Sequence, residues 1–178
     1  MRVRRVVTGH DGDGKAVFAS DEQVEALTLA LIPGAEFHRR WGADQAPTFP
    51  DDGGPTAQPS YFPPVGGYRF ALFAVPPETA SVPADLDLQA ALAEMEEKLP
   101  GLLAYLERDN PGMHTTDTID FEVVLSGEVI LELDDGVEKV LRPGDTVVQN
   151  ETRHRWGNRG TEPALLAVFL IGAHRGST

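Results

Sequence analysis

The last third of the chain alternates apolar and polar residues in short runs separated by turn-forming residues. The runs are "TIDFEVVLS" (118–126), "EVILELDD" (128–135), "EKVLRPGDTVVQ" (138–149) and "PALLAVFLIG" (163–172). A period of two is typical of strands with one buried face, and glycine-containing turns at this spacing favour antiparallel neighbours. The pattern therefore predicts four strands of an antiparallel sandwich or barrel.

The first 76 residues contain further β-like runs, interrupted by a long segment without any period. The runs cover residues 3–9, 16–21, 26–34, 36–42 and 68–76. Residues 44–67 are crowded with proline and glycine, which predicts a long surface loop. We expect residues 1–67 to form an N-terminal β arm that ends in this loop.

The hydrophobic period changes between residues 85 and 108. Leu88, Leu92, Met95 and Leu99 follow one another at steps of four, three and four, and Pro100 interrupts the series. These steps predict an amphipathic helix, which we expect to buttress one face of a sheet. A second, short helical piece is expected over residues 102–108.

Composition and charge indicate how many domains to expect and which kinds of binding partner are unfavourable. The chain has 178 residues, of which 41% are hydrophobic, so one compact domain over residues 1–178 is the simplest prediction. A formal charge of −13 repels nucleic acids and anionic membrane surfaces. The longest apolar run, residues 164–173, is about half the length of a membrane-spanning helix, and no secretory signal is recognisable. We expect a cytoplasmic protein.

Two segments carry candidate chemistry, "MHTTDTIDFEVVLSGEV" (113–129) and "PGDTVVQNETRHRWGN" (143–158). Without cysteine, any metal must be held by nitrogen and oxygen ligands. Asp120 and Glu122 lie two residues apart, so both point to the same face of their strand. On the hydrophobic pattern alone, Phe121, Val123 and Leu125 form the buried face, and the two acids face water.

The spacing within these segments gives a different orientation. The positions that define this spacing are His114, Thr116, Asp120 and Gly127 in the first segment and Gly144, His154 and Asn158 in the second. The paired motifs resemble those of the cupin superfamily. The resemblance implies an all-β fold, the cupin double-stranded β-helix, which is a jelly-roll-like antiparallel barrel. The barrel is expected over residues 68–178, with the helix as an insertion at about 85–108, and Asp120 and Glu122 are expected to point into it.

The resemblance also implies a metal site. Cupins typically hold one divalent ion with two histidines and a glutamate of the first motif and a histidine of the second. Here Thr116 replaces the second histidine and Asp120 the glutamate. The expected ligands are His114, His154 and either Asp120 or Glu122, a set suited to iron, manganese, nickel or zinc. Asp120 and Glu122 are also the candidate catalytic residues, as ligand or as acid/base.

The function expected from the resemblance is that of a metal-dependent enzyme acting on a small organic molecule, of the dioxygenase, isomerase, decarboxylase or cyclase type. The alternative is a noncatalytic cupin that binds a small molecule for sensing or storage. A third hypothesis, a partner-binding subunit, depends only on the charge and the proline-rich loop. We further expect a homodimer, because the N-terminal arm has few places to pair within a small barrel.

Other polar residues are weaker candidates. His38 and Trp41 either close the mouth of the pocket or pack in the core, and packing is the ordinary case. Gln149 is either a weak oxygen ligand or a structural amide. His10, in "GHDGDGK", is expected in a hairpin turn.

Overall fold

The structure is a computed structural model that describes residues 2–176. Strands make up 44% of it and helices 10%, which confirms the all-β prediction. Every strand pairs antiparallel with its neighbours, in sheets of two, six and three strands. The strands are β1 (Val3–His10), β2 (Ala16–Val24), β3 (Leu27–Leu29), β4 (Ile32–Ala43), β5 (Tyr68–Val75), β6 (Thr118–Ser126), β7 (Val129–Glu132), β8 (Glu138–Leu141), β9 (Thr146–Asn150), β10 (Arg155–Gly157) and β11 (Ala164–Gly172).

The barrel is built from a six-stranded sheet in the order β3-β4-β5-β11-β6-β9 and a three-stranded sheet in the order β10-β7-β8. Val124 and Leu166 of the larger sheet pack with Val129 of the smaller one, so a dry core joins the two sheets. The predicted strand at 118–126 coincides with β6. The run at 138–149 is two strands, not one, because the turn at 142–145 separates β8 from β9.

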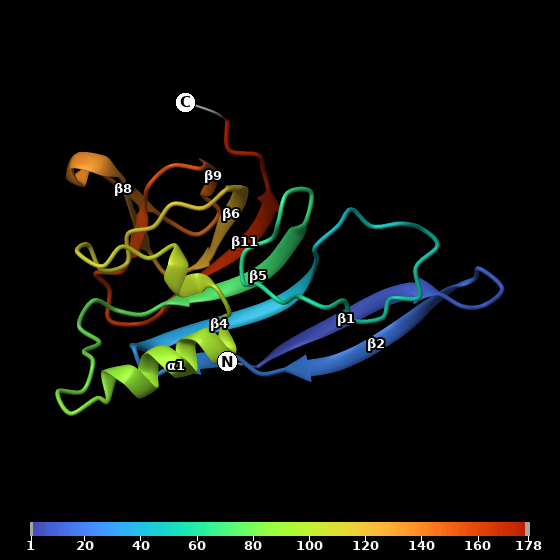
Figure 1. The fold of residues 1–178 in the computed structure, drawn as a ribbon, viewed down its shortest axis with the longest axis horizontal. Helices are drawn as coiled ribbons and strands as arrows, with labels where there is room; N and C mark the ends of the chain where they lie inside the picture. The colour runs from blue at the N-terminus through green and yellow to red at the C-terminus, as the bar shows by residue number, and fades with distance from the viewer. Residues whose placement is uncertain (1, 177–178) are drawn as a thin grey trace.

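The N-terminal arm is shorter than expected. Only β1 and β2 form a separate two-stranded hairpin, which Figure 1 shows projecting from the body of the molecule. Strand β4 instead pairs with β5 along most of its length, and β3 pairs with β4 at the edge of the large sheet. The prediction of an arm over residues 1–67 is therefore wrong for β3 and β4, whose hydrogen bonds complete the barrel sheet.

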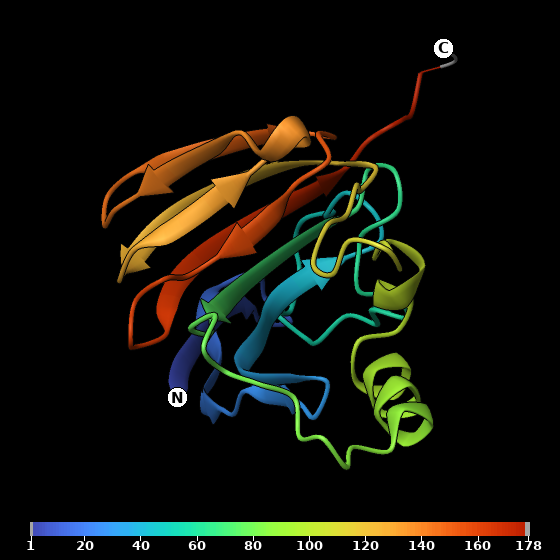
Figure 2. The same ribbon diagram turned by 90° about the vertical axis from the view of Figure 1, so that its left-hand side faces the viewer.

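The predicted helix is α1 (Leu88–Lys98), and its N-cap Asp87 accepts hydrogen bonds from the backbone of Gln89 and Ala90. Met95 and Leu99 are fully buried against β3 and β4, where they share a core with Phe37. Figure 2 shows the helix beside the sheet. The packing confirms a buttress. The second piece is only a short 3-10 helix, Leu102–Ala104.

The loop at 44–67 lacks a strand, as predicted, but it is not only a surface segment. Phe62 is buried in the core with α1, and Tyr61 packs against that core. Near its middle, the backbone of Asp51 accepts hydrogen bonds from the backbone and the ring of His10 in the arm. The loop therefore joins the arm to the barrel.

No helix between residues 2 and 176 combines the length and the apolar character that crossing a bilayer requires.

Candidate active site inside the barrel

Strand β6 turns its acidic side chains inward. Asp120 and Glu122 are buried, and the intervening Phe121 is exposed. The prediction from the hydrophobic pattern alone is wrong, and the orientation implied by the cupin resemblance is confirmed. The polar face of this strand points into the barrel because both neighbours, β9 and β11, hold it in that register.

The two histidine segments meet in space. His114 and His154 face each other in an isolated antiparallel bridge and exchange two backbone hydrogen bonds of 3.0 Å. This pairing places both side chains on one side, with their ring centroids 4.2 Å apart. Outside the bridge, Arg153 donates two hydrogen bonds to the carboxylate of Glu107, at 2.6 and 2.8 Å. The bridge and the ion pair together fix the separation of the two segments.

The hydrogen bonds of the two rings define their tautomers. Nδ1 of His114 lies 3.0 Å from the carbonyl oxygen of Gly112, and Nδ1 of His154 lies 2.9 Å from that of Thr152. A carbonyl only accepts, so each Nδ1 carries the hydrogen and each Nε2 keeps its lone pair. Metal-binding histidines are commonly oriented by such a bond from the second nitrogen.

The rings open onto a cavity of about 320 Å³ inside the barrel. His114, His154, Asp120 and Glu122 all line this cavity. The rest of the wall is mostly apolar and aromatic, and its aromatic members are Phe37, Tyr61, Phe62, Phe73 and Trp156. A cavity of this size, with few polar groups that converge in an apolar wall, is typical of a site for a small organic molecule.

Burial changes the protonation of the two acids. It raises the pKa of Asp120 to about 6, although a hydrogen bond from Thr118 opposes the shift. It also raises the pKa of Glu122 to about 8, and the nearby Asp120 carboxylate adds to this effect. At neutral pH, Glu122 therefore keeps its proton and Asp120 has lost its own.

Burial acts in the opposite direction on the imidazoles. It lowers the pKa of His154 to about 4, with a further contribution from His114. It also lowers the pKa of His114. Both rings are therefore neutral at pH 7, which is the state that binds a metal ion.

The donor set fits a metal ion in part. The two Nε2 atoms are suitable nitrogen ligands, and Oδ1 of Asp120 and Oε2 of Glu122 are buried without a hydrogen-bond partner. However, no three His, Asp or Glu side chains among residues 2–176 are gathered closely enough to hold one ion. The carboxylate ligand therefore stays a prediction.

The remaining predicted residues lie outside the cavity wall. Thr116 is buried with its hydroxyl 2.7 Å from that of Thr118. Gln149 accepts a hydrogen bond from Thr152, as a structural amide does. His38 is fully buried outside the cavity, and Trp41 lies on the outer face of the sheet, so neither closes the mouth of the pocket.

Sequence reasoning missed the contribution of the loop at 44–67. Tyr61 and Phe62 line the cavity, and burial raises the pKa of Tyr61 to about 12. The signal was the aromatic pair in "PSYFPP", because large aromatic side chains in a polar, proline-rich loop need a partner surface. Phe37 of β4 was missed because β4 was assigned to the arm.

Comparison with known proteins gives a family model described as "Cupin domain", which matches residues 106–171. This range contains His114, Asp120, Glu122 and His154. Among solved structures, the chain resembles the Cupin_2 domain of an XRE family transcriptional regulator from Enterobacter cloacae. That likeness has 15% identity and a TM-score of 0.38, over 60% of this chain and 83% of the other.

Two curated fungal relatives illustrate the range of similarity. The cupin-domain-containing oxidoreductase fogC of Aspergillus ruber is 28% identical over 96% of this chain and 72% of its own length. The phomopsin biosynthesis cluster protein D of Diaporthe leptostromiformis is 51% identical over 58 residues, which are 33% of this chain and 31% of the relative. The chain thus spans about a third of the length of this second relative.

Proposed function

Because this chain belongs to the cupin superfamily, we propose that its barrel cavity is the active site of a metal-dependent enzyme that converts a small organic molecule. The observation that carries the proposal is the pair formed by His114 and His154. Two neutral imidazoles stand side by side in an apolar cavity, each with Nδ1 bound to the backbone and Nε2 available.

The proposed ion is divalent iron, manganese, nickel or zinc. His114 and His154 would supply two nitrogen ligands, and Asp120 or Glu122, whose buried oxygens lack a partner, would supply the third. A bound ion would polarise a substrate oxygen or, if it is iron, support chemistry with dioxygen. In the motif, Thr116 takes the place of a further histidine, so water or substrate would occupy the coordination position that this histidine would fill.

The proposed substrate is small and largely apolar or aromatic. The cavity of about 320 Å³ is walled by aromatic rings such as Phe37, Phe73 and Trp156, which favour a flat hydrocarbon or aromatic body. The carboxyl groups on β6 offer one polar end of the site. Names of relatives that refer to biosynthesis clusters support a small-molecule substrate.

The proposed chemistry uses for proton transfer whichever of the two carboxyl groups does not bind the ion. If Asp120 is the ligand, Glu122 would donate a proton to a substrate oxygen at neutral pH; if Glu122 is the ligand, the ionised Asp120 would accept one. Relatives named as oxidoreductases support oxidation or reduction as the reaction class, ahead of isomerisation, decarboxylation or cyclisation.

The test is metal content on protein purified without chelator. We expect about one ion per chain in the wild type, and loss of the ion in His114→Ala and His154→Ala with an unchanged circular dichroism spectrum. His174→Ala, at an exposed histidine near the C-terminus, is the matched control and should keep its metal. Full metal occupancy in both cavity variants would contradict the assignment of the ligands.

The alternative is a noncatalytic protein that binds a small molecule in the same cavity. It is favoured by one observation, the absence of a gathered three-ligand set within residues 2–176. A wild-type protein that neither contains metal as purified nor takes up iron, manganese, nickel or zinc would favour this function over the enzyme.

A further inference from the structure

We propose that the hydroxyl group of Tyr61 binds the substrate inside the barrel by donating a hydrogen bond to a carbonyl or hydroxyl oxygen of the substrate. Tyr61 is then a specificity-determining residue, and the substrate is an apolar or aromatic molecule that carries an oxygen acceptor. This assignment rests on the proposed function of the cavity as the substrate site, but it requires neither the metal ion nor a particular reaction.

Tyr61 is the only residue with a hydroxyl group among the described residues that line the cavity of about 320 Å³. Several other polar groups of the wall are already engaged. The Nδ1 atoms of His114 and His154 donate to backbone carbonyls. The side chain of Asn158 makes three hydrogen bonds to the backbone, at 2.8 to 3.0 Å. The phenol therefore remains as a neutral donor for a ligand.

The ring of Tyr61 is held in place by the core of the protein. Its backbone N–H donates a 2.8 Å hydrogen bond to the carbonyl oxygen of Pro100, which follows α1. Phe37 and Phe62 are both buried, and their ring centroids lie 6.3 and 4.9 Å from that of Tyr61 in edge-on arrangements. A donor whose ring is already fixed loses little conformational freedom when a ligand binds, and this favours a specific hydrogen bond.

The hydroxyl group of Tyr61 has no hydrogen-bond partner in the part of the chain that the structure describes. A tyrosine enclosed in a protein usually pairs its hydroxyl group with an acceptor. The carboxyl groups of Asp120 and Glu122 are near enough for their charges to act on this hydroxyl group, and each has a buried oxygen without a partner. An oxygen atom of a ligand in the same cavity would supply the acceptor for Tyr61.

The hydroxyl group of Tyr61 is protonated at neutral pH. Burial raises the pKa of Tyr61 to about 12, and negative charge at Asp120 and Glu122 acts in the same direction. Arg39, which lines a separate small cavity, acts in the opposite direction but does not cancel the effect of burial. The phenol therefore keeps its proton and recognises an acceptor, such as a ketone, aldehyde or alcohol oxygen.

Two cavities of very different size border Tyr61. The cavity next to Arg39 measures about 10 Å³, which is room for about one water molecule. The barrel cavity of about 320 Å³ has the size of a site for a small organic molecule. A ligand oxygen that accepts from Tyr61 would therefore lie in the barrel cavity, which Asp120 and Glu122 also line.

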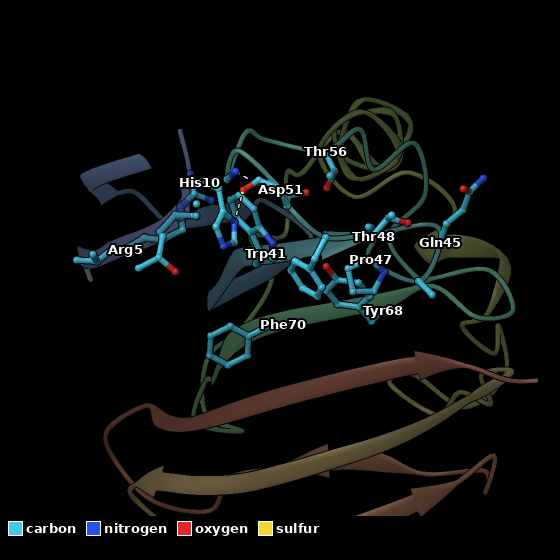
Figure 3. Close-up of a pocket in the computed structure, with 18 of the residues that line it drawn as sticks. Arg5, His10, Trp41, Gln45, Pro47, Thr48, Asp51, Thr56, Tyr68 and Phe70 are labelled. Carbon is cyan, nitrogen blue, oxygen red and sulfur yellow. Dashed lines mark hydrogen bonds between the residues drawn. The ribbon is translucent and has the colours of Figure 1, made fainter. Parts of the chain in front are cut away.

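Tyr68 provides a matched control on the other face of the sheet. Figure 3 shows it in the outer groove between the arm and β5, together with Trp41 and Phe70. Its ring lies 6.3 Å from that of Phe169, and it does not line the barrel cavity. Tyr68→Phe therefore removes the same chemical group as Tyr61→Phe without changing the proposed contact.

The test is the binding of two probes of nearly the same shape, acetophenone and α-methylstyrene, measured by NMR titration of the full-length protein. The ketone has an oxygen acceptor where the alkene has a CH₂ group. Tyr61→Phe should weaken the binding of acetophenone about 10-fold, as expected for the loss of one hydrogen bond between neutral groups. The binding of α-methylstyrene should not weaken. Tyr68→Phe should bind both probes as the wild type does.

Circular dichroism verifies that each variant is folded. A crystal structure of the wild type with acetophenone should place the ketone oxygen about 2.7 Å from the hydroxyl oxygen of Tyr61. A folded Tyr61→Phe protein that binds both probes as the wild type does would overturn the proposal, and so would a wild type that binds neither probe.

Each titration is carried out on protein kept in chelator and on protein incubated with zinc, so that the result is separate from that for the metal site. Weaker acetophenone binding by Tyr61→Phe, with no zinc uptake by the wild type, would support the role of Tyr61 and contradict the metal-dependent enzyme. Zinc bound at His114 and His154, with unchanged probe binding by Tyr61→Phe, would support the metal site and overturn the role of Tyr61.

Discussion

Strand β6 carries its acidic side chains inside the barrel and its apolar side chains outside, which is the reverse of an ordinary barrel strand. Asp120 and Glu122 point inward and are 3% and 6% exposed, whereas Phe121 and Leu125 point outward and are 44% and 46% exposed. In a strand with one buried face, the apolar side chains normally lie inside. Here each face departs from the pattern, and each departure requires its own explanation.

The comparison shows that the inner and outer faces of β6 must be explained separately. Burying two carboxyl groups costs free energy that a purely structural barrel would avoid, so the inner face is explained by the chemistry of the cavity. Exposed aromatic side chains such as Phe121 and Phe169 have no such explanation in the chemistry of the cavity, because they lie on the opposite face. The predictions below separate the two faces by substituting each in turn.

The largest expected effect comes from the inner face, in metal-free protein kept in chelator. The folded-state pKa of Glu122 is about 8, above its ordinary 4.5, so the folded protein holds this proton more tightly than the unfolded chain. The contribution of Glu122 to stability is therefore complete below pH 4.5 and is lost as pH rises through 8. Glu122→Gln should remove this loss, which is on the order of 4 kcal/mol at pH 9.

Urea unfolding at pH 4.5 and pH 9 measures this difference in the free energy of unfolding. Glu97→Gln, at an exposed position on α1, is the control and should follow the wild type at both pH values. If Glu122→Gln and the wild type lost stability equally between the two pH values, Glu122 would not be a buried, protonated acid, and the inner half of the comparison would fail.

A smaller effect, of opposite sign, is expected at His154. Its folded-state pKa is about 4, below the ordinary 6.5, so the unfolded chain binds the proton more tightly. The contribution of the neutral ring to stability is complete above pH 6.5 and is lost as pH falls through 4. Between pH 7 and pH 4, metal-free wild type should therefore lose about 3 kcal/mol more than His154→Gln.

The same urea titration, repeated at pH 7 and pH 4, provides the check. His174→Gln serves as the control, because that histidine is exposed and should leave the wild-type pH dependence intact. Identical losses in His154→Gln and the wild type would mean that the ring is already solvated or charged in the folded protein.

The smallest expected effect comes from the outer face. Phe121→Asp should leave both the secondary structure and the metal content unchanged, because the side chain of Phe121 points away from the cavity and is 44% exposed. Circular dichroism and metal analysis on the same preparation measure the two properties. A folded Phe121→Asp protein that has lost its metal would contradict the separation of the two faces.

Much of the fold was predictable from the sequence because hydrophobic period and turn residues are local signals. These signals directly predicted the first and last residues of β6 and the central turns of α1. Strand partners depend on distant residues, and this is why β4 was assigned to the arm although it pairs with β5. The 3-residue strand β10 was missed because so short a run has no measurable period.

The site was predictable only in part. The spacing of His114 and His154 identified two segments that do meet in space. Their distance could not follow from the sequence, because it depends on the bridge and on the ion pair between Arg153 and Glu107. The orientation of β6 could not follow from its own pattern either, since that pattern places the apolar residues inside, and the structure places the acids there. The aromatic wall from the loop needed the packed structure.

The measurement that tests the central claim most directly is anomalous X-ray scattering from crystals of the full-length protein grown with zinc. The claim is that the Nε2 atoms of His114 and His154 converge on one ion inside the barrel. It predicts a single strong anomalous peak about 2.1 Å from both Nε2 atoms, with an oxygen of Asp120 or Glu122 as a further ligand. A peak bound to neither histidine, or two imidazoles turned away from each other with no ion between them, would contradict the claim.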